Sequence, residues 1–291
     1  MSITERLANL SIPTVIITVM VLFGLRYVLR KQESAIAKSV GETAESLAVA
    51  MALVYLLIRP FIVQAFFIPS ESMVPTLLIS DHIMVNKFIY RFGEPKAGDV
   101  IVFKAPKMAS PDEKDFIKRV VAVAGDVVKI KPGYVLVGES SFSHVDLLTQ
   151  LSAMGTGRGR VDVKLNNDRV LVNGQLVSNE EVAAAVGDPN GKVKVIAGKV
   201  IINGKPLNEP YVAEDPDEPY PGGRGYVDPD WIVVDKQKDQ AVKIPEGKLL
   251  VLGDNRNESN DARYWGLLDR QRVLGKAMFI FWPLNRIRWV R

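Results

Sequence analysis

The stretch Ile-Pro-Ser-Glu-Ser-Met-Val-Pro-Thr-Leu, residues 68–77, marks the point where an apolar N-terminal region gives way to a more polar chain. Two serines, Ser70 and Ser72, lie one residue apart between Pro69 and Pro75. Because proline fixes its own φ and restricts the residue before it, this stretch is predicted to be extended or turned. A serine held rigidly beside an apolar segment can present its hydroxyl outward, which makes Ser72 a candidate nucleophile.

Upstream of this stretch, residues 7–25 form an uncharged run rich in Ile, Val, Met and Leu that ends before Arg26. At about 1.5 Å per residue, the run can span a hydrocarbon core roughly 30 Å thick. A removable signal peptide is the alternative, but the run is long and no small-residue cleavage site follows it. We therefore expect a retained transmembrane helix at about residues 7–29.

A second apolar stretch covers residues 46–68 and is interrupted by Arg59 and Pro60. Arg59 is predicted to extend to the lipid head groups and Pro60 to kink or end the helix, which leaves residues 61–68 in or on the membrane interface. We expect the second transmembrane helix at about residues 44–66. A buried core helix is the alternative, and the presence of two apolar runs ahead of a more polar chain argues against it.

The distribution of basic residues predicts the orientation. Four basic residues fall in the connector at residues 26–45, against Arg6 alone in the N-terminal tail. The positive-inside rule places this connector in the cytoplasm and everything after Ile68 outside. Residues 1–68 are therefore expected to be a membrane anchor, and residues 69–291 an extracytoplasmic domain.

Composition excludes several kinds of site. The 291 residues include no Cys, so thiol catalysis and thiolate metal sites are ruled out. His82 and His144 belong to no motif with metal-ligand spacing, so we expect no metal and no cofactor. A net charge of +4 is not arranged as a nucleic-acid-binding stripe, and no nucleic-acid partner is expected. A hydrolase built on this chain is predicted to use a base other than histidine.

The chain beyond residue 77 is predicted to be mainly β. Residues 99–104 and 115–123 are β-branched runs, each beside a Gly-Asp turn signal. Period-2 alternation places Lys118 on one strand face with Phe116 and Val120. Burying an unpaired ammonium is costly, so this lysine must reach solvent, pair with an acid or lose its proton.

Residues 131–197 are richer in Gly, Asn and charge, and Asn-Gly pairs at Asn173 and Asn203 occur in two similar β-branched contexts. Asn-Gly between such runs indicates a hairpin, so we predict an inserted, hairpin-rich side lobe at about residues 131–197. No chemical motif falls within it, and we expect it to be dispensable for chemistry.

The last informative stretch, residues 253–266, is dense with Asx-turn formers and charges and ends in Tyr-Trp-Gly. A solvated loop is the usual meaning of such composition. The alternating positions of Ser259, Asp261 and Arg263 place them toward one side if the chain is extended.

Four segments, taken in order and in their spacing, resemble the successive boxes of the bacterial type I signal peptidase (leader peptidase) family: residues 68–77, 98–106, 118–126 and 253–266. The resemblance implies a mainly β catalytic domain of antiparallel sheets preceded by two transmembrane α-helices. It also implies a membrane-bound serine endopeptidase with a Ser-Lys dyad, active at the outer face of the bacterial cell membrane. Departures from the family pattern at Ala124, Asn257, Glu258 and Ala262 touch neither the nucleophile nor the base.

The resemblance assigns Ser72 as the nucleophile and Lys118 as its general base. It also implies that Ser70 donates a hydrogen bond to the oxyanion and that Ser259 orients Lys118. Asp261 and Arg263 are implied to form a supporting ion pair. Lysine can act as a base only when uncharged, and burial on an apolar face lowers its pKa. Moving that pKa from about 10.4 to near 8 takes roughly 3 kcal/mol, which desolvation can supply.

The expected partners are secreted preproteins and membrane lipid. Preproteins carry small residues in an A-x-A pattern before the cleavage site, so shallow apolar pockets are expected. By resemblance, the pocket candidates are Phe66, Ile68, Met73, Phe116 and Ile117, and the same side chains could equally be ordinary core.

Two alternatives remain open from the sequence. The first is a different Ser-Lys enzyme such as the self-cleaving repressor-type proteases, which are soluble and bind DNA; the two apolar spans argue against it. The second is a non-enzymatic, membrane-anchored β binding module, which leaves Lys118 on an apolar face unexplained.

Overall fold

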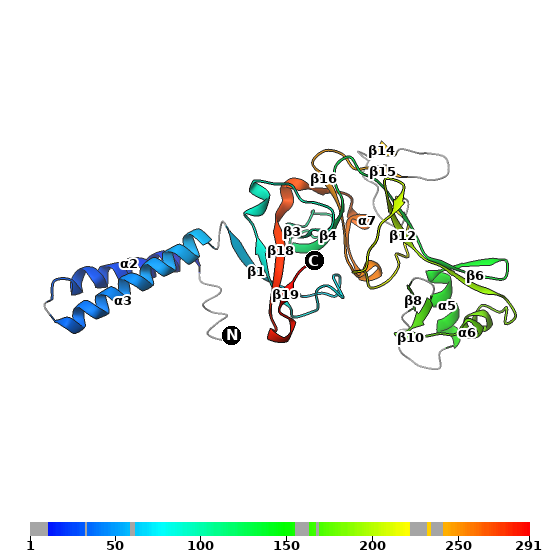
Figure 1. Ribbon diagram of the computed structural model, residues 1–291, viewed down its shortest axis with the longest axis horizontal. Helices are drawn as coiled ribbons and strands as arrows, with labels where there is room; N and C mark the ends of the chain where they lie inside the picture. Colours follow the sequence, from blue (N-terminus) through cyan, green and yellow to red (C-terminus); the bar gives the residue numbers. More distant parts are fainter. Residues whose placement is uncertain are drawn as a thin grey trace.

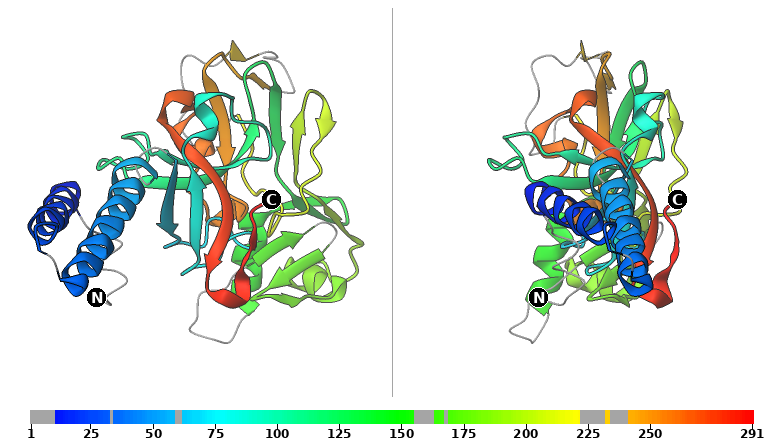
Figure 2. Two further views of the ribbon diagram at one scale, coloured as in Figure 1. Left: turned by 60° about the vertical axis from the view of Figure 1, so that its left-hand side comes forward. Right: turned by 90° about the vertical axis from the view of Figure 1, so that its left-hand side faces the viewer.

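The computed structural model describes residues 11–32, 34–58, 62–154, 163–166, 169–221, 232–233 and 241–291. Three parts follow one another along the longest axis of the molecule: a pair of helices, a β domain and a smaller lobe (Figure 1). The helix pair projects from one side of the β domain, and the lobe lies at the other end of the long axis (Figure 1; Figure 2, left).

The two N-terminal helices are long and apolar enough to cross a membrane. The first helix, α2 (Ile12–Leu29), begins at Ser11, whose hydroxyl accepts a hydrogen bond from the Thr14 N–H. The second, α3 (Ala35–Ala52), continues as a π-helical turn, η1 (Leu53–Ile58). Arg26 Nε donates to Glu45 at 3.0 Å, which joins the two helices by an ion pair.

The bounds of the second helix differ from those expected. It begins at Ala35 rather than near residue 44, and it ends at Ile58 rather than near residue 66. The expectation followed the apolar run alone, whereas helix-forming residues and the Arg26–Glu45 pair extend the helix toward its N-terminus. Residues 63–67 form a strand instead. Their backbone pairs with the following strand of the sheet, and their side chains alternate between its two faces. Arg59 and Pro60 lie outside the described residues.

The β domain is built on an antiparallel sheet in the order β1-β2-β18-β3-β4-β16-β17, with β19 pairing β18. Its strands are β1 (Val63–Phe67), β2 (His82–Asn86), β3 (Val100–Lys104), β4 (Asp115–Ala122), β16 (Lys248–Leu252), β17 (Leu268–Asp269), β18 (Val273–Trp282) and β19 (Arg288–Trp289). The two predicted β-branched runs are β3 and β4, which pair with each other from Val100↔Arg119 to Lys104↔Asp115. Gly98 and Gly125 have φ of 93° and 91°, the left-handed geometry that glycine adopts without strain.

A second antiparallel sheet continues from the first along the chain, in the order β13-β12-β5-β15-β14. Its strands are β5 (Val127–Lys131), β12 (Lys199–Ile202), β13 (Lys205–Pro206), β14 (Ile232–Val233) and β15 (Val242–Lys243). Side chains of β4, β16 and this sheet bury one continuous apolar core that includes Val120, Val128 and Leu250. The fold is therefore mainly antiparallel β, preceded by two apolar helices, as predicted.

The lobe contains two small sheets and two helices with a core of their own. Its elements are β6 (Tyr134–Val137), β7 (Ser140–Ser143), α5 (His144–Met154), β8 (Val163–Asn166), β9 (Arg169–Val172), β10 (Gln175–Leu176), α6 (Asn179–Ala185) and β11 (Val193–Ile196). The lobe also contains the helices α5 and α6, which were not predicted from the sequence. A capping box between Ser178 and Glu181 starts α6. Asn173 and Asn203 have positive φ, and the turn at Asn203 joins β12 to β13 outside the lobe.

The remaining short helices connect these strands. They are η2 (Ile89–Arg91), η3 (Arg256–Glu258), α7 (Ala262–Trp265), η4 (Arg270–Arg272) and η5 (Leu284–Arg286). The segment that holds η3 and α7 follows β16. The Asn255 N–H in this segment donates to the Ser72 carbonyl, so the residues after β16 and those after β1 lie side by side.

Candidate active site

Ser72 lies in a compact turn between β1 and β2. The Val74 N–H donates to the Glu71 carbonyl at 3.0 Å, and the Leu77 N–H donates to the Met73 carbonyl at 2.8 Å. Met73 and Leu77 are fully buried and anchor the turn in an apolar cluster. Ser72 itself is nearly buried, at 6% exposure. These two anchors, together with buried Ile68 before the serine, hold the turn in one place.

Lys118 reaches Ser72 from the middle of β4. Its Nζ lies 2.7 Å from Ser72 Oγ and 2.8 Å from the Ile117 carbonyl oxygen, donating to both. The lysine is 5% exposed, on the strand face where the alternation pattern placed it. The structure thus brings together two side chains that are 46 residues apart in the sequence.

Burial sets the protonation of this lysine. Desolvation lowers the pKa of Lys118 to about 8, although the negative charges of Asp261 and Asp254 act to raise it. A substantial fraction of the amine is therefore uncharged near pH 8. An uncharged amine at hydrogen-bond distance from a hydroxyl can accept its proton.

Ser70 lies beside Ser72, and their hydroxyl oxygens are 3.4 Å apart. Ser70 is exposed, so its hydroxyl can turn toward a bound molecule. The Ser72 N–H has no hydrogen-bond acceptor among the residues that the structure describes. Two donors are thus available next to the Ser72 hydroxyl.

Gly253 marks a close approach between two parts of the site. A Cβ at this position would collide with Ser259 Oγ and with the Ser72 carbonyl oxygen. Only glycine lets the end of β16 pass this close to both serines. Ser259 is buried beside this close approach, and its role in orienting Lys118 stays a prediction.

Asp261 and Arg263 form a buried ion pair. Arg263 Nε donates to Asp261 Oδ1 at 2.9 Å and Nη2 donates to Oδ2 at 3.1 Å. The Gly253 N–H also donates to Asp261 Oδ2 at 3.1 Å, so the pair holds the backbone at the close approach. Burial acts to raise the pKa of Asp261, but the charge of Arg263 and these hydrogen bonds outweigh it and lower that pKa.

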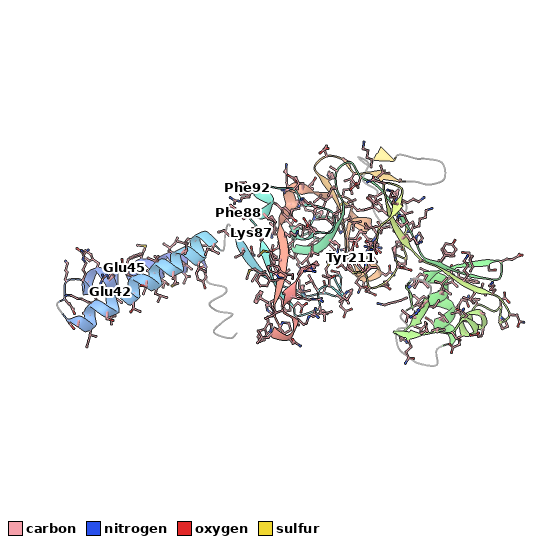
Figure 3. The ribbon with its side chains drawn as sticks, viewed as in Figure 1. Glu42, Glu45, Lys87, Phe88, Phe92 and Tyr211 are labelled. Carbon is pink, nitrogen blue, oxygen red and sulfur yellow. The ribbon has the colours of Figure 1, made fainter. Side chains whose placement is uncertain are left out.

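The structure adds a second buried ion pair that the sequence analysis did not predict. Arg119 Nε donates to Asp254 Oδ1 at 2.8 Å and Nη2 donates to Oδ2 at 2.7 Å. Arg119 Nη2 also donates to Thr76 Oγ1 at 3.2 Å, and its guanidinium lies 3.9 Å from the ring centroid of Tyr211, labelled in Figure 3. The sequence features that could have indicated this ion pair are Asp254, in the Gly-Asp-Asn stretch, and Arg119, which directly follows Lys118.

Backbone contacts tie this segment to the Ser72 turn. The Asn255 N–H donates to the Ser72 carbonyl at 3.1 Å, and Asn255 Nδ2 donates to the Glu71 carbonyl at 3.2 Å. Arg256 Nε donates to the Gly253 carbonyl at 3.1 Å, and its guanidinium pairs with Glu209. Asn255, Arg256 and Glu209 were not predicted as site residues, since their contacts join segments far apart in the chain.

Four of the five pocket candidates lie together. Phe66, Ile68, Met73 and Ile117 belong to the apolar cluster that holds the Ser72 turn. Phe116 lies apart from them: it packs against the other core, with its ring centroid 6.3 Å from that of Phe103. The reason is strand alternation, which points Phe116 and Ile117 to opposite faces of β4. Among the described residues no cluster of His, Asp or Glu could hold a metal ion.

The site joins a nearly buried serine to a buried lysine of lowered pKa in an antiparallel β domain, with apolar helices ahead of it. A serine beside a buried lysine, with no histidine in contact among the described residues, is the arrangement typical of serine hydrolases whose base is not histidine. A model of the family described as "Signal peptidase, peptidase S26" matches residues 40–151 and 182–282. The chain belongs to this family and is a serine peptidase.

Several named proteins are similar to this chain. A signal peptidase I of Leptolyngbya laminosa is 31% identical over 234 residues, covering 79% of this chain and 74% of that protein. A signal peptidase I of Aquifex aeolicus is 34% identical over 237 residues, covering 79% and 80%. A crystal structure of a signal peptidase I from Enterococcus faecalis covers 63% of this chain and 97% of that chain at 20% identity, with a TM-score of 0.23.

Proposed function

We propose that this protein is a membrane-bound endopeptidase that removes signal peptides from secreted preproteins, with Ser72 as nucleophile and Lys118 as general base. The observation that carries the proposal is the 2.7 Å contact between Lys118 Nζ and Ser72 Oγ. A serine hydroxyl needs an adjacent base to become an effective nucleophile, and a lysine can be that base only when its pKa is lowered. Burial lowers the pKa of Lys118 to about 8.

The reaction proceeds in two halves. Uncharged Lys118 takes the proton of the Ser72 hydroxyl as Oγ attacks the carbonyl carbon of the scissile peptide bond. The ammonium of Lys118 then gives this proton to the leaving amine, the C–N bond breaks, and an acyl ester remains on Ser72. Water, deprotonated by Lys118, attacks the ester, and Ser72 leaves with the proton from Lys118.

The charge that develops on the carbonyl oxygen needs hydrogen-bond donors. The Ser72 N–H and the Ser70 hydroxyl are the two donors adjacent to the attacking oxygen. Donors held in place before the reaction stabilise the transition state without reorganisation, and each is worth about 10²–10³ in rate. The ion pair Asp261–Arg263 supports the site indirectly through the Gly253 backbone, and Ser259, buried against Gly253, is assigned the orientation of Lys118.

Substrate selection follows from the apolar cluster beneath the Ser72 turn. Phe66, Ile68, Met73 and Ile117 are buried or half-buried there, which leaves little depth for a large substrate side chain. Small residues at the two pocket positions before the scissile bond fit this arrangement, in agreement with an A-x-A cleavage pattern. Phe116 packs apart from this cluster on the Lys118 face of β4, where Lys118 Nζ lies 5.6 Å from its ring centroid, and it stays a candidate for that side of the site.

The protein is proposed to span a bacterial cell membrane twice, with the catalytic domain outside. Phe88 and Phe92 support a lipid partner: they are 42% and 81% exposed and lie on the helix-facing side of the β domain (Figure 3). The Lys87 N–H donates to the Ile62 carbonyl at 2.8 Å, so this apolar tip lies beside the point where the chain leaves the helices. Aromatic side chains at this level favour the membrane interface.

The decisive experiment incubates the detergent-solubilised protein with a preprotein that carries Ala at the first and third positions before the cleavage site. Mass spectrometry of the products is expected to show a single cut after the second of these alanines, and none with the Ser72→Ala variant. Cleavage elsewhere, or equal cleavage by Ser72→Ala, contradicts the proposal.

A further inference from the structure

We propose that residues 286–291 form a C-terminal clasp on the turn that carries Ser72, and that Arg288 in this clasp is a positioning residue for the nucleophile. The inference rests on the proposed function of Ser72. Three contacts along this short segment reach the turn or its immediate partners, two through arginine side chains of the segment and one through the Arg291 backbone oxygen.

The first contact fixes the far end of the turn. Arg286 Nε donates to Asp81 Oδ1 at 2.7 Å and Nη2 donates to Oδ2 at 2.8 Å. Asp81 is almost fully buried, and its Oδ2 also accepts the Leu78 N–H at 2.8 Å. The Ile68 N–H donates to the Asp81 carbonyl at 2.9 Å, which closes the loop on itself. Arg286 therefore pairs with the buried carboxylate of Asp81, the residue whose backbone carbonyl closes the loop.

The second contact lies in the middle of the turn. Arg288 Nη2 donates to the Thr76 carbonyl at 2.7 Å and to the Pro75 carbonyl at 3.2 Å. A single guanidinium thus bridges two successive carbonyls three and four residues after Ser72. Hydrogen bonds from a charged donor are stronger than those from a neutral donor, and the planar guanidinium fixes their geometry. This bridge therefore restricts the backbone between Ser72 and Leu77.

The third contact joins the clasp to the buried ion pair. Arg119 Nη2 donates to the Arg291 backbone oxygen at 3.1 Å, and the same nitrogen reaches Thr76 Oγ1 and Asp254. Val290 packs against the apolar cluster beneath Ser72, and its N–H donates to the Met278 carbonyl at 2.8 Å. The clasp therefore has an apolar anchor between its polar contacts.

The Ser72 turn is consequently held from two sides. Asn255 binds the Ser72 carbonyl on one side, and Arg288 binds the Pro75 and Thr76 carbonyls on the other. A misplacement of about 1 Å between reacting groups can cost about 10²-fold in rate. Arg288 is exposed, so its removal deletes little buried area and leaves the core intact. We therefore assign Arg288 an effect on turnover rather than on folding.

The test compares Arg288→Ala, Arg288→Lys and a matched control, Arg270→Ala, on a model preprotein. Arg270 Nη2 also donates to two backbone carbonyls, of Tyr90 at 2.8 Å and Gly93 at 3.3 Å, away from the Ser72 turn. Arg288→Ala is expected to lower kcat about tenfold or more with KM changed less than twofold. Arg288→Lys is expected to recover most of the loss, because an ammonium can still donate to both carbonyls, and Arg270→Ala is expected to keep kcat within twofold.

The pH dependence and the melting temperature complete the test. The apparent pKa of the rate profile is expected to be the same in Arg288→Ala, because the burial of Lys118 is unchanged, and the melting temperature to fall by less than about 4 °C. The clasp is overturned by an Arg288→Ala kcat within twofold of wild type, by an equal loss in Arg270→Ala, or by a loss that Arg288→Lys does not recover. If instead the unmodified protein fails to cleave, or Ser72→Ala cleaves normally, the proposed function itself is wrong.

Discussion

Arg119 and Asp254 form a fully buried ion pair on the face of β4 opposite to Lys118, with 2.8 Å between Nε and Oδ1 and 2.7 Å between Nη2 and Oδ2. The consecutive basic residues Lys118 and Arg119 therefore lie in different electrostatic environments. Among the described residues, none places a carboxylate in direct contact with Lys118, and burial lowers its pKa to about 8. Arg119 keeps its charge, because a guanidinium does not lose its proton in proteins, and needs the carboxylate.

The ion pair gives a stability prediction. Asp254→Asn removes the compensating charge and leaves the Arg119 guanidinium buried, which is expected to destabilise the protein by about 3–5 kcal/mol. Urea unfolding followed by tryptophan fluorescence measures the change. The matched control is Asp115→Asn, whose partner Lys104 is half exposed, and there the loss is expected to stay under about 1 kcal/mol. Equal losses in the two variants contradict the special role of the buried pair.

The proposed dyad predicts a pattern of inactive variants. Ser72→Ala and Lys118→Ala are each expected to abolish preprotein processing without unfolding the protein, and their effects are not expected to add. Lys118→Arg is expected to be equally inactive, because a guanidinium cannot act as a base. Cleavage rates of purified variants test this, with Lys104→Arg on the neighbouring strand as an active control. A Lys118→Arg variant that retains substantial activity excludes the dyad.

The oxyanion donors predict a smaller loss at Ser70. Ser70→Ala removes one of two proposed donors and is expected to lower kcat by about 10²–10³, less than the loss in Ser72→Ala. Ser70→Thr keeps a hydroxyl and is expected to retain more activity than Ser70→Ala. Steady-state kinetics on one preprotein separate these cases, and full activity in Ser70→Ala removes this residue from the mechanism.

The lowered pKa of Lys118 predicts the pH dependence. Because the uncharged amine is the active form, kcat/KM is expected to rise about tenfold per pH unit below pH 8 and to level off above it. The direction follows from desolvation, which disfavours the ammonium and so moves deprotonation down from the ordinary lysine range. Initial rates between pH 6 and 10 measure the profile, with melting temperatures recorded at each pH. A profile that is flat across this range rules out lysine as the titrating base.

The insert gives a prediction about modularity. Lys131 pairs with Lys199 in the register of β5 and β12, so the two ends of the lobe meet in one ladder. Replacing residues 132–198 by a short Gly-containing turn is therefore expected to leave cleavage within about tenfold, a cost near 1.4 kcal/mol. The same excision combined with Ser72→Ala provides the inactive control. Complete loss of activity in a folded excision variant shows that the lobe contributes to the site.

Much of this fold follows from local sequence. The change from apolar to polar at residues 68–77 separates the helices from the β domain, and period-2 alternation places Lys118 on its apolar face. The turns at Gly98 and Asn173 follow from positive φ, which glycine and asparagine accept. These features are encoded within a few residues, because backbone dihedrals and side-chain alternation are local properties.

Other features required the folded chain. The start of α3 at Ala35, and the pairing of residues 63–67 as β1, run against the apolar pattern of the same stretch. Local pattern did not distinguish a strand from an interfacial helix there, because both bury an apolar face and only the pairing with β2 decides between them.

The partners of the site depended most on tertiary structure. The sequence indicated Ser72 and Lys118, yet only the fold shows that Arg119 meets Asp254, 135 residues away, and that Arg288 meets Thr76, 212 residues away. It also separates Phe116 from the other pocket candidates. Periodicity along a strand states which face a side chain occupies. Which residue it meets across that face is determined by sheet order and by the packing of segments that are remote in sequence.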